Sequence, residues 1–270
     1  MTDRYAVIGH PVAHSKSPRI HTAFARETGE DLVYDLLPAP LDGFDAVVRT
    51  FRAAGGRGLN VTVPFKLAAF ALANEVTDRA REAGAVNTLR FDGAHALGDN
   101  TDGAGLVGDI RRRLGIELAG KSVLLLGAGG AARGVVGPLL QERPAALLIV
   151  NRTVAKAHAL ARQFEARGPV RAGAYADLTG RAFDVVINAT SASLSGDALP
   201  LPALLYAPGA LAYDMVYGDV PTPFLAAARA GGAATVADGL GMLVAQAAES
   251  FLLWRGVRPD TRPVIEALRP

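Results

Sequence analysis

Several glycines directly follow an apolar run in the middle of the chain. The run 122–126 leads into Gly127-Ala128-Gly129-Gly130-Ala131-Ala132, which fits the spacing G-x-G-x-x-G/A. In that spacing the first glycine allows a tight turn, the second lets a pyrophosphate approach the backbone, and a small third residue lets helix and strand pack closely. Glycines alone can mark an ordinary turn. The apolar strand before them and the helical pattern after them favour a dinucleotide site at a helix N-terminus.

The end of the next predicted strand indicates which dinucleotide is bound. An NAD site usually carries a carboxylate here that binds the ribose diol, whereas this strand ends in Val150-Asn151-Arg152-Thr153. Arg152, with Thr153 and Lys156 nearby, could hold a 2′-phosphate, because a planar and permanently charged guanidinium suits phosphate. Arg152 could also be an ordinary surface residue that opens a helix. We predict NADP rather than NAD.

Small polar residues gather at strand ends and turns of the N-terminal half. Asn60 and Thr62 alternate along one predicted strand and so share a face, and Lys66 follows at its carboxyl end. Ligands of open α/β sheets bind beyond the carboxyl ends of the strands. These groups would therefore suit a polyhydroxylated substrate, and a lysine there can donate to a reacting oxygen. The further members of the set are Ser15, Ser17, Asn87 and Asp102.

Each of these residues also has a purely structural interpretation. Ser17 and Asp102 could cap the helices that they precede, and Asn60 could be a hydrogen-bonded amide at a strand end. Lys66 is explained least well in this way, because the chain otherwise uses arginine for positive charge, with 24 arginines and 4 lysines.

The elements that must position these residues alternate between short apolar strands and amphipathic helices. In the N-terminal half we expect strands at 5–9, 33–37 and 58–63, and a hairpin around Asp92-Gly93. In the second half, almost purely apolar runs such as 122–126 and 147–150 are typical of parallel strands covered on both faces. We therefore predict the α/β class, with a doubly wound sheet in the second half.

Composition excludes several classes of protein. Half of the 270 residues are hydrophobic and 20% are charged, which excludes a disordered chain, and the length suits two domains. With 28 basic and 26 acidic residues, nothing indicates a nucleic-acid or membrane-surface binder. The chain has no cysteine and its 5 histidines lack ligand spacing, so we expect no disulfide and no metal. No signal peptide or membrane span is evident, so we expect a cytoplasmic protein.

Several stretches together resemble the shikimate dehydrogenase family, in the family's order and along essentially the whole chain. In the N-terminal half they are 9–18 (GHPVAHSKSP), 60–66 (NVTVPFK), 84–88 (GAVNT) and 98–103 (GDNTDG). In the second half they are 151–153 (NRT), 188–191 (NATS), 213–217 (YDMVY) and 238–244 (DGLGMLV) with Gln246. The departures are His10, where an asparagine is often seen, and residues 192–194; neither removes a matched side chain.

The resemblance implies a role for each matched side chain. Lys66 and Asp102 would form the catalytic pair. Ser15 and Ser17 would bind a substrate carboxylate, which Tyr217 would reach from the other domain. The ring hydroxyls would be held by Asn60, Thr62, Asn87, Asp102 and Gln246. The cofactor would contact Gly127, Ala128, Gly129, Gly130 and Ala131 at its pyrophosphate, Asn151, Arg152, Thr153 and Lys156 at its adenosine phosphate, and Thr190, Met215 and Gly239 at its nicotinamide.

The implied reaction is the reversible, NADPH-dependent reduction of 3-dehydroshikimate to shikimate in aromatic amino-acid biosynthesis. The implied architecture is a substrate-binding domain formed by 1–102 and 239–270, a Rossmann-type NADP-binding domain formed by 103–238, and a cleft between them. We expect small molecules as its only partners and a monomer or homodimer. An enzyme that oxidises quinate with NAD is disfavoured by Arg152, and a non-catalytic sensor of shikimate-like ligands is disfavoured by the intact Lys66 and Asp102.

Overall fold

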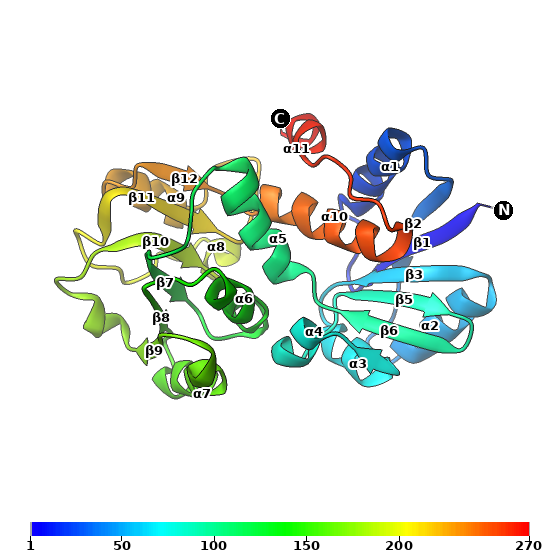
Figure 1. Cartoon of the computed structure of the whole chain (residues 1–270), viewed down its shortest axis with the longest axis horizontal. Coiled ribbons are helices and arrows are strands. Elements are labelled where there is room, and N and C mark those ends of the chain that lie inside the picture. Colours follow the sequence, from blue (N-terminus) through cyan, green and yellow to red (C-terminus); the bar gives the residue numbers. More distant parts are fainter. Residues whose placement is uncertain (1, 270) are drawn as a thin grey trace. The chain divides into compact units, whose positions relative to one another are not determined.

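The computed structural model describes residues 2–269, with the side chains of residues 194 and 195 left aside, and it divides into two compact units. The first unit comprises the chain up to Gly105 together with Val244–Leu268, and the second comprises Leu106–Leu243. The chain passes from one unit to the other within two helices, α5 (Asp102–Gly108) and α10 (Leu240–Arg255), both labelled in Figure 1.

The first unit is built on a six-stranded mixed sheet in the order β2-β1-β3-β5-β6-β4. The predicted hairpin is confirmed, because β5 (Thr88–Asp92) and β6 (His95–Asp99) pair in antiparallel. The sequence pattern missed β4 (Glu75–Val76), because two residues carry no periodicity. The other strands are β1 (Asp3–Gly9), β2 (Leu32–Pro38) and β3 (Gly56–Val61), and the helices are α1 (Ser17–Thr28), α2 (Phe44–Ala53), α3 (Lys66–Leu72), α4 (Asp78–Ala83) and α11 (Arg262–Leu268).

The second unit contains the predicted doubly wound sheet. Its strand order is β12-β11-β10-β7-β8-β9 and every pair is parallel, which is the order of dinucleotide-binding folds. The strands are β7 (Ser122–Leu126), β8 (Ala146–Val150), β9 (Val170–Gly173), β10 (Phe183–Asn188), β11 (Tyr206–Asp214) and β12 (Thr235–Ala237). The helices α6 (Gly130–Gln141), α7 (Val154–Phe164), α8 (Ala192–Ser195) and α9 (Pro223–Ala230) connect them.

Alternate residues of these parallel strands belong to two different apolar layers. Val123 and Leu125 of β7 pack in one buried cluster, whereas Leu124 and Leu126 pack in another. Successive side chains of a strand point to opposite faces, so a strand covered on both faces needs an apolar residue at every position. This arrangement explains the uninterrupted apolar runs of the sequence and leaves the carboxyl ends of the strands as the places where polar residues can stand.

The helical segment that begins at Asp102 has two parts. After α5 the backbone forms a π-helical turn at Asp109–Arg113. The fully buried Asp109 carboxylate accepts hydrogen bonds from Arg113 Nε at 2.5 Å and from the hydroxyl of Tyr213 at 2.8 Å. These hydrogen bonds occur where the helix widens into the π-helical turn. The periodicity of the sequence does not predict them. Among residues 2–269, none of the helices combines the length and the apolar character that a bilayer crossing requires.

Candidate active site

Lys66 and Asp102 meet in the first unit. Lys66 is the first residue of α3 and Asp102 is the first residue of α5. Lys66 Nζ lies 2.5 Å from Asp102 Oδ2, and the two side chains are 31% and 14% exposed. The structure thus places a charged donor beside a carboxylate at a position that solvent still reaches. The sequence names the same two residues as a catalytic pair, and that role stays a prediction.

The carboxamide of Asn87 holds the second oxygen of Asp102. Asn87 Nδ2 donates to Asp102 Oδ1 at 2.8 Å, and Asn87 Oδ1 accepts from the Thr101 backbone N–H at 2.9 Å. A backbone N–H can only donate, so Thr101 decides which end of the carboxamide is the oxygen, and Nδ2 must face Asp102. Gln246 of α10 joins this group, with Oε1 3.4 Å from Asn87 Nδ2 and 3.2 Å from Thr101 Oγ1.

Two serine hydroxyls lie side by side where α1 begins. Ser15 Oγ donates to Ser17 Oγ at 3.1 Å, and the Ser17 N–H donates to Ser15 Oγ at 3.2 Å. The Ser15 hydroxyl, rather than a side chain at the N-cap position, therefore accepts from the first N–H group of α1. Hydroxyls at a helix N-terminus suit an anionic group such as a carboxylate.

Thr62 follows β3 and lies against Gly9. An added Cβ at Gly9 would lie only 2.4 Å from Thr62 Cγ2, so the close approach of these residues requires glycine.

Asn60 is 5% exposed, and its carboxamide is fully hydrogen-bonded inside the first unit. Oδ1 lies 2.7 Å from the Tyr34 hydroxyl, which donates to it, and 3.1 Å from His21 Nε2. Nδ2 donates to Ser250 Oγ at 2.9 Å and to Thr88 Oγ1 at 3.2 Å. This saturation supports the interpretation of Asn60 as a satisfied strand-end amide. A direct contact between Asn60 and a substrate stays a prediction.

The glycine loop of the second unit fits an anionic pyrophosphate. Gly127 has φ +110°, in the region that favours glycine, and a Cβ there would lie 3.0 Å from the Ala189 carbonyl oxygen. Gly129 and Gly130 have no atom within 4 Å of an added Cβ, so space in front of the loop is open. The N-cap residue of α6 is Gly129, which has no side chain to cap the helix, so the first N–H groups of α6 suit an anion. Ala132 is fully buried.

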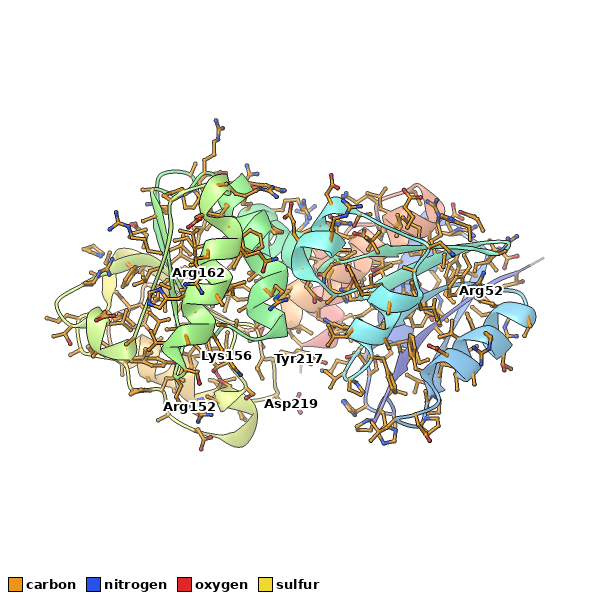
Figure 2. The ribbon with its side chains drawn as sticks, turned by 90° about the horizontal axis from the view of Figure 1, so that it is seen from below. Arg52, Arg152, Lys156, Arg162, Tyr217 and Asp219 are labelled. Carbon is orange, nitrogen blue, oxygen red and sulfur yellow. The ribbon has the colours of Figure 1, made fainter. Side chains whose placement is uncertain are left out.

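Positive side chains stand at the start of α7. Figure 2 shows Arg152 and Lys156 at this end of the helix, with Arg162 farther along it. Arg152 and Lys156 are exposed, and α7 has no side-chain cap. Asn151 shapes the turn, because its Nδ2 donates to the Thr153 carbonyl at 3.0 Å. An exposed guanidinium and ammonium beside uncapped N–H groups fit the 2′-phosphate of NADP.

The structure brings the predicted nicotinamide residues close to one another and to the glycine loop. An added Cβ at Gly239 would lie 2.2 Å from the Met215 carbonyl oxygen, so the two backbones touch. An added Cβ at Gly127 would lie 3.2 Å from Thr190 Cγ2, so Thr190 borders the loop. The Thr190 hydroxyl donates to Asn188 Oδ1 at 2.7 Å, which fixes its orientation.

Sequence reasoning missed the buried carboxylate that organises these segments. Asp214, at the end of β11, is fully buried. Its oxygens accept from Asn188 Nδ2 at 3.2 Å, Ser193 Oγ at 2.6 Å, Thr222 Oγ1 at 2.6 Å and the Val216 N–H at 3.0 Å. The available signal was an asparagine and an aspartate at the carboxyl ends of the neighbouring strands β10 and β11. Ser193, in the stretch that departs from the family pattern, is thereby part of the network.

The predicted role of Tyr217 stays a prediction, like the roles of the other matched side chains. Tyr217 belongs to the second unit, where it follows β11 and is half-buried, and burial raises the pKa of its hydroxyl. Its contact with a substrate carboxylate stays a prediction. His10 is exposed, and its Nδ1 lies 2.9 Å from the Ala39 carbonyl oxygen, which is a structural contact.

Comparisons with known proteins point to one family. Three of its models match: the shikimate dehydrogenase substrate binding domain at residues 7–89, shikimate/quinate 5-dehydrogenase at 110–195, and the shikimate 5′-dehydrogenase C-terminal domain at 239–269. A shikimate dehydrogenase (NADP(+)) of Dechloromonas aromatica is 60% identical over 100% of this chain and 98% of its own length.

Solved structures agree over the full length. The Ael1 enzyme of Pseudomonas putida is 49% identical with a TM-score of 0.95, covering 100% of this chain and 99% of that one. Shikimate 5-dehydrogenase of Thermus thermophilus, solved with NADP(H) and shikimate, is 37% identical with a TM-score of 0.86, covering 98% of each chain.

Proposed function

Because the chain belongs to the shikimate dehydrogenase family, we propose that it interconverts 3-dehydroshikimate and shikimate with NADP as cofactor. The observation that carries this proposal is the contact between Lys66 Nζ and Asp102 Oδ2, because it supplies the charged donor that carbonyl reduction requires. NADPH supplies the hydride when it is bound. In the reduction, the hydride forms a C–H bond at carbon 3 of the ring and a proton is added to the former carbonyl oxygen.

The first unit binds and polarises the ring in this proposal. Ser15 and Ser17 hold the carboxylate, and Asn87 and Gln246 accept and donate hydrogen bonds at the ring hydroxyls. Negative charge develops on the carbonyl oxygen as the hydride arrives, and the Lys66–Asp102 pair stabilises this charge and provides the proton. The contact of Asn87 with Asp102 keeps the carboxylate from turning away from Lys66.

The second unit holds the cofactor in this proposal. Gly129 and Gly130 leave room for the pyrophosphate, since nothing lies within 4 Å of an added Cβ at either position. Arg152 and Lys156 bind the 2′-phosphate through charge-assisted hydrogen bonds. Thr190 and Met215 border the nicotinamide, and the hydrogen bonds of Thr190 to Asn188 preorganise that border.

The experiment follows NADP reduction by absorbance with the purified protein and shikimate, in parallel with quinate and with NAD. We expect turnover with shikimate and NADP. The variant Lys66→Ala should lose about 100-fold or more in kcat with a modest change in shikimate affinity, because the donor acts mainly in the transition state. Lys121→Ala, which removes an exposed lysine of the second unit, is the matched control and should retain full activity.

The protein could be folded and bind shikimate, as detected by calorimetry, yet show no turnover with any combination of substrate and cofactor. That result would refute the dehydrogenase function and favour a sensor. Equal turnover with quinate or with NAD would refute the substrate or the cofactor assignment separately. Full turnover by Lys66→Ala would refute the role of the lysine.

A further inference from the structure

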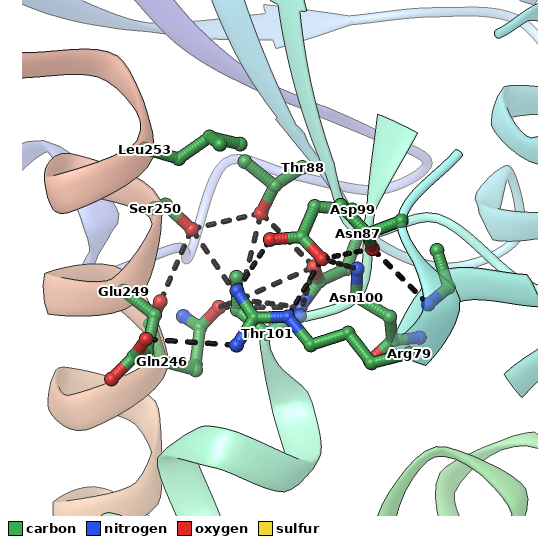
Figure 3. A network of polar contacts seen from close by, with 12 residues as sticks. Arg79, Asn87, Thr88, Asp99, Asn100, Thr101, Gln246, Glu249, Ser250 and Leu253 are labelled. Atoms are coloured by element: carbon green, nitrogen blue, oxygen red, sulfur yellow. Dashed lines mark hydrogen bonds and ion pairs between the residues drawn. The ribbon is translucent and has the colours of Figure 1, made fainter. Parts of the chain in front are cut away.

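Five predicted substrate residues of the first unit belong to one continuous hydrogen-bonded network: Asn60, Lys66, Asn87, Asp102 and Gln246. The Tyr34 hydroxyl donates to Asn60 Oδ1 at 2.7 Å. Asn60 in turn donates to Thr88 and Ser250. Figure 3 shows how Thr88 and Ser250 join the group around Asn87, Thr101 and Gln246. Asn60 and the Lys66–Asp102 pair are thus connected through Thr88 and Asn87, and neither the sequence nor the family resemblance assigned a role to Thr88.

Thr88 lies at the centre of this hydrogen-bonded network. It is fully buried at the start of β5, so water does not substitute for its partners. Its Oγ1 accepts from Asn60 Nδ2 at 3.2 Å, donates to Asn87 Oδ1 at 3.0 Å and lies 2.8 Å from Ser250 Oγ. A hydroxyl has one proton and two lone pairs, so these three partners use its full capacity. Asn87 Oδ1 can only accept, so the hydrogen bond between Thr88 and Asn87 requires the Thr88 hydroxyl as its donor.

The hydrogen bond from Thr88 to Asn87 matters because Asn87 in turn contacts Asp102. Asn87 Oδ1 accepts from the Thr88 hydroxyl and from the Thr101 backbone N–H, so the carboxamide is held from two sides. Its opposite end donates to Asp102 Oδ1, while Asp102 Oδ2 contacts Lys66. A change at Thr88 therefore reaches Lys66 through three contacts, by way of Asn87 and Asp102. A buried donor or acceptor left without its partner is costly, so Asn60 and Asn87 would rearrange if the hydroxyl were lost.

We propose that Thr88 is a positioning residue for the reaction, which orients Asn87 and through it the Lys66–Asp102 pair without touching substrate. The inference rests on the proposed function for its kinetic consequence. The alternative is that Thr88 merely fills space in the core of the first unit. The two differ in which part of the side chain matters: positioning needs the hydroxyl, whereas filling space needs the volume.

Two variants separate these interpretations. Thr88→Val keeps the shape and removes the hydroxyl, and Thr88→Ser keeps the hydroxyl and removes a methyl group. We expect Thr88→Val to lower kcat with shikimate by about tenfold, because a displaced Lys66–Asp102 pair stabilises the transition state less well. The KM for NADP should stay within about twofold, because that site lies in the second unit. Thr88→Ser should retain kcat within about twofold of the parent protein.

Two kinetic results overturn the proposal: equal losses of kcat in both variants, or an unchanged kcat in Thr88→Val. Should Thr88→Val not fold, Thr88→Cys takes its place with the same expectations, because a thiol is only a weak donor. A crystal structure of the hydroxyl-deficient variant tests the inference without turnover. We expect the Asn87 carboxamide to be displaced from Asp102, and an unmoved Asn87 overturns the proposal. Inactivity of the parent protein with shikimate refutes the proposed function instead, and the crystal structure then decides on Thr88 alone.

Discussion

At the scale of the residue, two asparagine side chains make different contacts because their surroundings differ. Asn60 and Asn87 are 5% and 3% exposed. Asn60 uses its four hydrogen-bonding positions on neutral partners, whereas Asn87 directs its Nδ2 at the carboxylate of Asp102. The sequence identified both residues as members of a polar set. The partners of Asn60 come from α1, β2, β5 and α10, distant in the sequence, and no local pattern reveals them.

The cofactor preference belongs to this scale, because it depends on Arg152. We expect Arg152→Ser to raise the KM for NADPH about 10- to 100-fold, since charge-assisted hydrogen bonds to the 2′-phosphate are lost. The KM for NADH, which lacks that phosphate, should change by less than about twofold. Steady-state kinetics with both cofactors measure the difference. Arg162→Ser, farther along α7, is the matched control and should affect neither KM. An equal loss of affinity for NADPH and NADH in Arg152→Ser would contradict the 2′-phosphate assignment.

At the scale of the element, buried charge fixes α10 to the sheet of the first unit. Asp99, at the end of β6, is 1% exposed and accepts from Arg79 Nε at 2.7 Å and Thr77 Oγ1 at 2.6 Å. Arg79 also lies 3.6 Å from Glu249 of α10, as Figure 3 shows. Burial by itself would raise the pKa of Asp99, but hydrogen bonds and charge from Arg79 outweigh it and hold the pKa below its ordinary value. Asp102, one member of the predicted catalytic pair, thus follows a firmly held strand end.

The closeness of α5 and α10 gives a prediction at this scale. A Cβ added at Gly105 would lie 2.6 Å from Gln246 Cβ and 2.8 Å from its backbone nitrogen. We expect Gly105→Ala to lower the free energy of unfolding by about 1–3 kcal/mol, because the backbones must separate. It should also lower kcat/KM for shikimate by about tenfold or more, because Gln246 moves with α10. Urea unfolding and steady-state kinetics measure the two effects.

Gly108→Ala is the matched control in the same helix. Its added Cβ meets the flexible guanidinium of Arg112, at 2.2 Å from Nη2, rather than a backbone. Its unfolding free energy should stay within about 1 kcal/mol of the parent value, because alanine favours helix over glycine by about that amount. Equal behaviour of the two variants would show that the approach of α5 to α10 has no special importance.

At the scale of the whole molecule, the response of stability to pH is set in part by one buried imidazole. His21 is 1% exposed and stacks on Tyr34, with ring centroids 4.2 Å apart and the planes 5° from parallel. Burial lowers the pKa of His21 to about 3, with the hydrogen bond to Asn60 acting against it. The imidazole therefore stays neutral in the folded protein over most of the accessible pH range, and Nε2 carries the proton that faces Asn60 Oδ1.

The difference between the pKa of His21 in the folded and unfolded protein determines how the free energy of unfolding changes with pH. The pKa of His21 is about 6.5 in the unfolded chain and about 3 in the folded one. Its contribution to stability is therefore complete above pH 6.5 and is lost as the pH falls toward 3. Between pH 8 and pH 5 the free energy of unfolding should fall by about 2 kcal/mol on this account.

His21→Gln, which does not titrate, isolates this contribution. Urea unfolding of both proteins at the two pH values measures it. The glutamine variant should be less stable than the parent at pH 8, because the ring packing is lost, and the gap should narrow by about 2 kcal/mol at pH 5. A gap that is independent of pH would mean that His21 titrates normally in the folded protein.

The sequence by itself determined the features that are local or periodic. The apolar run 122–126 and the glycines after it predicted a strand, a turn and a helix with a dinucleotide site, because steric limits and side-chain periodicity act within a few residues. Arg152 predicted NADP as the cofactor for the same reason. A permanently charged side chain at a strand end can bind a phosphate without a partner from elsewhere in the sequence. The resemblance extended this to a substrate and a set of side chains.

Only the tertiary structure decided which of those side chains work together. Thr88, Ser250 and Asp214 carry no periodic signal, because a buried hydroxyl or carboxylate is tolerated only where the fold supplies its partners. The partners of Asn60 come from residues 26, 28 and 190 positions away, and the partner of Lys66 from 36 positions away. Hydrogen bonds depend on distances of a few ångströms in space, which the order of residues along the chain does not specify until the strands and helices have packed.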